Sequence, residues 1–154
     1  MEDSLIAAWN THNRIQVFVL QALPEANLVD TAQPRGKTVG EQFAHMHNVR
    51  LMWLKASAPE LLNGLNKLEK SDALSTSSLR DALLASGNAI AELLRQALAS
   101  GGRVKGFKPD AAAFVGYLIS HESFHAGKID MTLRIAGHPM DDKTHYGMWE
   151  WGVR

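Results

Sequence analysis

The sequence predicts an all-α fold, a four-helix bundle with a long first connection and a short C-terminal tail that packs on the bundle. Apolar residues recur at helical spacing over nearly all of the 154 residues. The β-branched run VFVL lies inside one of these helical stretches, so no convincing pair of strands is indicated. The length favours a single domain over residues 1–154.

The first helix is expected over about residues 5–23, where Pro24 closes it. A loop with Pro34 and Gly36 follows. The second helix begins at Thr38, because Thr38-Val39-Gly40-Glu41 reads as a capping box. The helix is expected to extend to about Ala56, and its apolar stripe comprises Val39, Phe43, Met46, Val49 and Trp53.

The second half of the chain predicts two more long helices. Residues 59–77 are expected to form one or two helical turns, with Pro59 at a helix start, and then a loop. The third helix spans about residues 79–99 and is capped by Ser77 or Ser78.

The fourth helix is the longest. Pro109 suits its first position, and the apolar pattern continues to Ala136. Gly137 and Pro139 end it. A tail with two tryptophans and no clear period follows.

Composition excludes several classes of function. With 16 basic and 16 acidic residues the formal net charge is zero, and no face collects Lys and Arg, so a nucleic-acid partner is not expected. No apolar run reaches the roughly 20 residues of a membrane span. The acidic N-terminus MEDSLIAAWN lacks a signal-peptide pattern, and we expect a cytoplasmic protein. Without cysteine, a transition-metal site must rest on some of the seven histidines.

Two of these histidines share one face of the fourth helix. His121 and His125 are four residues apart, which places both imidazoles one turn from each other, in a workable geometry for two ligands of one ion. A third ligand is needed to make such a pair specific, because many helices carry a pair of this kind by chance.

The stretch His121-Glu122-Ser123-Phe124-His125 also fits the protease pattern H-E-x-x-H. Related downstream patterns require a glycine and a third ligand where this chain has Lys128 and Met131. A zincin protease is therefore not expected. Since Glu122 is about 100° around the helix from His121, an outward-facing or supporting role is expected for it.

The second helix offers two candidates for a third ligand, His45 and His47. They are about 200° apart on a helix, so both cannot point into one site, and periodicity alone does not choose between them. His12 falls on the apolar stripe of the first helix, where a hydrogen-bonded core histidine is expected.

These motifs together resemble the DinB/YfiT-like superfamily, a family of damage-inducible helical bundles that is distinct from the DNA polymerase of the same name. The resemblance rests on GEQFAHM at residues 40–46 and on HESFHAGKI at residues 121–129. It implies a four-helix bundle that holds a divalent metal ion through His45, His121 and His125. Ala126 and Lys128 stand where many members have Arg and Gln, so shared substrate contacts are not implied.

The resemblance also implies a class of function. Members with an assigned activity are mostly thiol-dependent transferases or metal-dependent hydrolases, so the leading hypothesis is a metal-dependent thiol S-transferase acting on small molecules. The alternatives are a metal-dependent hydrolase, with Glu122 or Tyr117 near the water, and a non-enzymatic metal- or ligand-binding protein of the stress response. Zn or Ni is favoured as the ion, with Fe as a further candidate.

Several roles stay open in the sequence. No catalytic residue can be named, and the roles of His47 and Glu122 are not fixed. Trp149 and Trp151 could cap the bundle, cover the pocket or join a partner chain. Homodimerisation is common in the family and is an expectation here.

Overall fold

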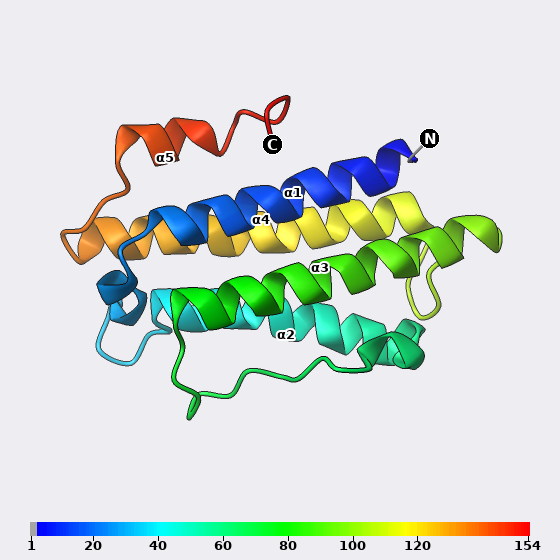
Figure 1. The fold of residues 1–154 in the computed structure, drawn as a ribbon, viewed down its shortest axis with the longest axis horizontal. Coiled ribbons are helices and arrows are strands. Elements are labelled where there is room, and N and C mark those ends of the chain that lie inside the picture. Colours follow the sequence, from blue (N-terminus) through cyan, green and yellow to red (C-terminus); the bar gives the residue numbers. More distant parts are fainter. Residues whose placement is uncertain (1–2) are drawn as a thin grey trace.

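The computed structural model describes residues 3–154, and no strand occurs within them. Four long helices dominate, as the sequence predicts (Figure 1). No helix among these residues is both long and apolar enough to cross a membrane. The helices, with the short 3₁₀ turns written η, are α1 (Ser4–Ala22), η1 (Glu25–Val29), α2 (Val39–Ser57), η2 (Pro59–Leu62), α3 (Thr76–Ala99), α4 (Ala111–Ile135) and α5 (Asp142–Gly147).

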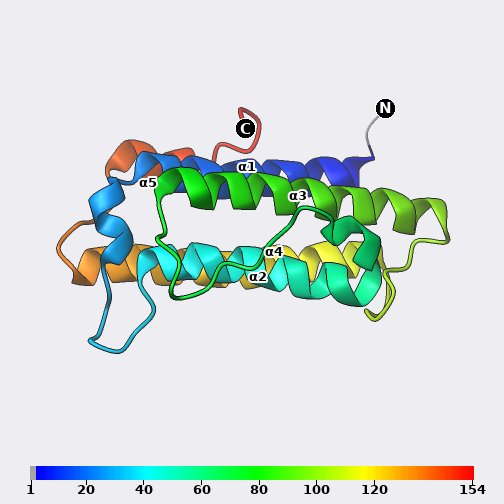
Figure 2. The same cartoon turned by 60° about the horizontal axis from the view of Figure 1, so that its bottom comes forward.

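The four long helices form two layers, with α1 and α3 in one and α2 and α4 in the other (Figure 2). Helices α2 and α3 run in the same direction, so the chain between them returns along the length of the bundle (Figure 1). Parallel neighbours in a bundle require such a crossover. The fold therefore has a second long connection besides the predicted first one, and we call residues 63–75 the crossover segment.

The crossover segment is held against α2 by side chains of that helix. The amide of Asn48 donates to the carbonyl of Leu68 at 2.8 Å and accepts from its backbone N–H at 2.9 Å. His47 contacts the carbonyl of Asn66 through Nε2 at 2.8 Å and the carbonyl of Ala82 through Nδ1 at 3.0 Å. His47 thus joins α2, α3 and the crossover segment.

Capping residues explain where the helices begin. The predicted capping box of Thr38 and Glu41 is present. Helix α3 begins earlier than predicted, at Thr76, because Ser75 and Ser78 form a second capping box. Helix α4 begins later than predicted, because Asp110 accepts from the N–H of Ala113 and is the N-cap; Pro109 therefore precedes the helix.

The tail contains a short helix, α5, that the sequence pattern did not reveal. It begins with Asp141 as its N-cap. Helix α5 and the C-terminal residues fold back along α1 and α4 (Figure 1). The predicted packing of the tail on the bundle is thereby confirmed. Arg154 lies over the ring of Phe18 in α1, with its guanidinium carbon 3.7 Å from the ring centre.

A buried ion pair joins α2 to α4 in the middle of the apolar core. Glu122 is 1% exposed and Arg50 is 0% exposed. The Nε and Nη2 of Arg50 donate to the two carboxylate oxygens of Glu122 at 2.6 and 2.8 Å. Nη1 donates to the carbonyl of Leu83 and to the hydroxyl of Ser86 in α3. His12 in α1 completes the cluster, with Nε2 2.8 Å from Glu122, so the predicted core histidine is confirmed.

This arrangement keeps Glu122 ionised. Complete burial opposes its negative charge, but the charge of Arg50 and the hydrogen bonds from Arg50 and His12 outweigh burial and lower its pKa from 4.5 to about 2. Because the folded pKa is depressed, the stabilisation is fully present above pH 4.5 and is lost as the pH falls toward 2. The outward-facing role considered for Glu122 is therefore wrong, because its side chain points into the core and holds the fold through Arg50 and His12.

We expect Glu122→Gln to lower the free energy of unfolding by about 3–5 kcal/mol at pH 7, because it leaves a buried guanidinium without its counter-ion. Urea denaturation followed by circular dichroism measures this loss. The double variant Arg50→Met/Glu122→Gln should lose less than the sum of the two single variants. Additive losses would contradict a coupled pair.

We also expect the wild-type protein to lose stability relative to Glu122→Gln when the pH is lowered from 4.5 toward 2. The physical reason is protonation of the paired carboxylate, which the amide variant lacks. Urea midpoints measured across this range test the sign. A constant difference between the two proteins would show that Glu122 does not carry the acid dependence.

Candidate metal centre

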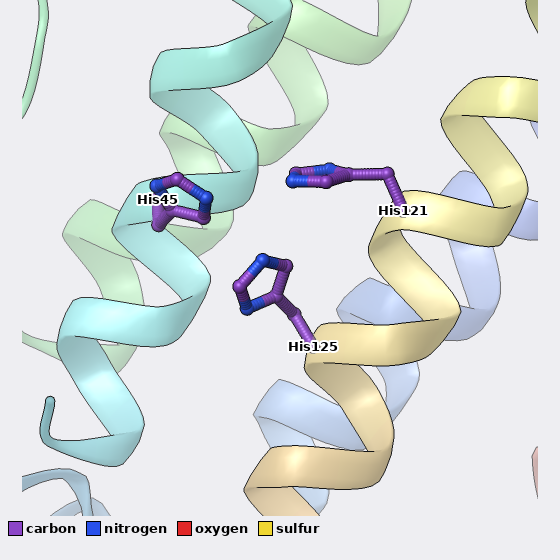
Figure 3. A group of neighbouring side chains, drawn as sticks. All are labelled: His45, His121 and His125. Carbon is purple, nitrogen blue, oxygen red and sulfur yellow. The ribbon is translucent and has the colours of Figure 1, made fainter. Parts of the chain in front are cut away.

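Three histidines from two helices converge between α2 and α4. His45 projects from α2, and His121 and His125 project from successive turns of α4 (Figure 3). Each offers a ring nitrogen, and these three atoms lie within 4.8 Å of one another. The ring centres of His45 and His125 are 4.5 Å apart, and those of His121 and His125 are 4.7 Å apart. This triad is the group that the resemblance implied.

The position of His45 depends on how α2 begins. The capping box fixes the first turn of the helix, and Gly40 lies against η1, where a Cβ would stand 3.2 Å from the carbonyl oxygen of Leu28. A side chain at Gly40 would therefore force a shift of a few tenths of an ångström between α2 and η1. His47 points instead toward α3 and the crossover segment, where backbone carbonyls contact both its ring nitrogens. The structure thus decides between the two histidines that periodicity left open.

The triad favours neutral imidazoles. Burial, followed by the charge of Lys37, lowers the pKa of His45. Burial also lowers the pKa of His121, against the opposing charge of Glu122. For His125, burial and the neighbouring His45 and His121 lower the pKa to about 4. A neutral ring has a nitrogen lone pair available for a metal ion, whereas a protonated ring has none.

Two further observations fit a metal ion. Nδ1 of His121 is buried and has no hydrogen-bond partner among residues 3–154. Such an atom is rare unless an ion or water satisfies it. Nδ1 of His125 lies 3.3 Å from Oε1 of Gln42, which suits donation from Nδ1 and leaves Nε2 free. Tyr117 stacks on His121, with ring centres 6.3 Å apart.

Two hollows open beside the triad. One has a volume of about 310 Å³ and reaches His45 between α2 and the crossover segment. The other has a volume of about 340 Å³ and reaches His125 between α4 and the first connection. Lys37 lines both hollows, Lys67 and Lys70 line the first, and Lys128 lines the second. Glu41 and Glu69 also line the first hollow, and no acidic residue among residues 3–154 lines the second, so four lysines stand beside two carboxylates around the triad.

The remaining candidates lie elsewhere. Glu122 is turned away from the triad into the ion pair with Arg50, so it cannot serve as the base of a zincin-like site. His138 pairs with Asp30 at the surface. His145 lies in α5, and neither hollow beside the triad is lined by a residue of the tail.

Sequence reasoning missed three supporting residues. Gln42 lies three positions before His45, on the same side of α2, where a partner for the triad was worth seeking. Arg50 is a charged residue among apolar ones in the same helix, which is a signal for a buried partner. Lys37 precedes the capping box in a loop, and no periodic signal places it.

Comparison with known proteins agrees with these observations. The family model described as the DinB family matches residues 1–151. A search of curated proteins gives no significant match.

We expect Gln42→Leu to weaken the affinity of the triad for zinc about 10- to 100-fold, because the variant removes the acceptor that orients His125. Competition with a chromophoric chelator measures this affinity. The matched control is Gln96→Leu, which changes the same residue type at an exposed position of α3, outside both hollows, and should leave the affinity unchanged. Equal affinities for Gln42→Leu and the wild type would refute the orienting role.

Proposed function

The chain belongs to the DinB family, and on this premise we propose that it is a metal-dependent thiol S-transferase that acts on small molecules. The observation that carries the proposal is the cluster of three neutral imidazoles beside two lysine-lined hollows. A chain without cysteine has no thiol of its own to offer, so the sulfur would come from a second small molecule.

His45, His121 and His125 would hold the ion, and the family and donor set favour Zn or Ni, with Fe as a further candidate. A bound divalent ion supplies positive charge that favours the thiolate form of a thiol. In the proposed reaction the thiolate sulfur forms a bond to an electrophilic carbon. The leaving group departs with the bonding electron pair, and the thiol proton passes to solvent.

The protein's own residues would bind and orient the reactants. Lys37 lines both hollows and can pair with a carboxylate on either substrate. Gln42 holds the ring of His125, and Tyr117 stacks on His121. The lysines favour a thiol that carries a carboxylate over a neutral one.

Two alternative functions would give different experimental results. A hydrolase would turn over esters or amides without thiol, and a non-enzymatic binding protein would take up metal without turnover.

We expect about one divalent ion per chain in untagged protein, by elemental analysis after purification without chelators. The triple variant His45→Ala/His121→Ala/His125→Ala should lose it, because all three ligands are gone. His138→Ala is the control, since this histidine lies at the surface, 52% exposed, and outside the triad. Retention of the ion in the triple variant would refute the metal site.

We expect transfer of a thiol to an activated aryl or alkyl halide only in the metal-loaded protein, measured by loss of free thiol. Lys37→Gln should raise KM for the carboxylate-bearing thiols cysteine and glutathione by about 3- to 10-fold, because one screened charge pair contributes about 1 kcal/mol. KM for neutral 2-mercaptoethanol should not change. Equal effects on both kinds of thiol would exclude Lys37 from carboxylate binding, and thiol-independent turnover would favour the hydrolase.

A further inference from the structure

A separate cavity of about 290 Å³ lies between α1, α4 and the C-terminal segment. Helix α4 contributes Ala126 and Asp130 to this cavity, and they are about 140° and 180° around the helix from His121. The cavity therefore faces the opposite side of α4 from the triad. Its lining residues are His12, Ile15, Gln16, Ser123, Ala126, Gly127, Asp130, His145, Met148, Trp149 and Trp151.

Three polar atoms of the lining residues are buried and have no hydrogen-bond partner among residues 3–154. They are Oε1 of Gln16, Oδ1 of Asp130 and Nδ1 of His145. Gln16 itself is 4% exposed, so it lies deep in the wall. A buried acceptor without a donor is destabilising, and several in one cavity indicate a ligand that supplies the donors.

Asp130 gives the cavity its charge. Its Oδ2 accepts from Nε of Arg134 at 3.0 Å, and that ion pair leaves Oδ1 unused. His12 also lines the cavity, but its Nε2 is engaged by Glu122. The unsatisfied groups are thus a carboxylate oxygen, an amide oxygen and an imidazole nitrogen, and two of the three can only accept hydrogen bonds.

The remaining wall is largely apolar and aromatic. Ile15 and Ala126 line it from the bundle, and Met148, Trp149 and Trp151 line it from the tail. An indole face attracts an organic cation as well as an apolar ring. The two tryptophans that the sequence left without a role are therefore part of this cavity.

We propose that this cavity is a binding site for a small organic amine, protonated at nitrogen and attached to an aromatic or apolar body. The ammonium group would donate to Asp130 and Gln16, and the body would pack between the tail and α1. An anionic ligand of the same shape would meet the charge of Asp130. The site lies apart from the triad, and it requires no metal ion.

The probes are phenethylamine, 2-phenylethanol and phenylacetate, which share one body and carry a positive, a neutral and a negative group. Isothermal titration calorimetry on the full chain should show phenethylamine binding about tenfold or more tightly than the other two, since a charge-assisted hydrogen bond distinguishes them. No binding of phenethylamine at millimolar concentration, or equal binding of phenylacetate, would overturn the proposal.

Two variants test Asp130 as the partner of the amine. Asp130→Asn should weaken phenethylamine about tenfold. Arg134→Gln breaks the same ion pair from the other side but keeps the carboxylate, so it should bind phenethylamine as tightly as the wild type or more tightly. Equal losses in both variants would show that only the ion pair mattered.

Two further variants test the location. A Cβ at Gly127 would meet no atom within 4 Å, so Gly127→Leu can extend into the cavity without a backbone clash, and it should abolish phenethylamine binding. Its thermal unfolding shows whether it folds. The triple alanine variant of the triad should bind phenethylamine unchanged. Loss of binding in that variant, with binding retained in Gly127→Leu, would place the amine at the triad and refute the second site.

Discussion

The contact on which the triad depends is the buried pair of Arg50 and Glu122. It joins α2 to α4, the two helices that carry the three histidines, and it fixes how far one can slide along the other. Glu122 directly follows His121 in the chain, so the ion pair holds the backbone of α4 next to that histidine. His12 and Ser86 extend the same cluster to α1 and α3, and all four helices are thereby held to one centre.

Helix α4 has three faces, each with a different neighbour. One face presents His121 and His125 to α2, and the next presents Glu122 to the core. The opposite face presents Ala126 and Asp130 to the cavity between α1, α4 and the C-terminal segment. Because α4 has other elements on several sides, different residues of this one helix can line two separate cavities. The ion pair stabilises the shared helix for both.

The sequence predicted what depends on local spacing. The four-residue separation of His121 and His125, the capping box at Thr38 and the end of α4 just before Gly137 are local features, and the four-helix architecture follows from such patterns. The choice of His45 over His47 could not be made from periodicity, because it depends on the carbonyls of Asn66 and Ala82 in other segments.

The sequence pattern also could not predict that α2 and α3 run in the same direction. Residues 63–75 have no period, and the contacts of His47 and Asn48 that hold them along α2 join residues about 20 positions apart in the chain. The six residues of α5 are too few for a periodic signal to stand out. The cavity beside it joins residues of α1 to residues of the tail, a pairing that no local pattern contains.

The same five letters, HESFH, have a different chemical meaning here from the one they have in a protease, and the partner of Glu122 is the reason. A zincin needs that carboxylate free to take a proton from water. Here both carboxylate oxygens accept hydrogen bonds from Arg50 or His12, away from the triad. A thiol ionises with a pKa of about 8.5 without any protein base, whereas free water, with a pKa of about 15.7, needs either such a base or a metal ion to ionise near neutral pH. The engagement of Glu122 by Arg50 and His12 therefore supports our proposal of thiol activation over the alternative of hydrolysis with Glu122 as the base.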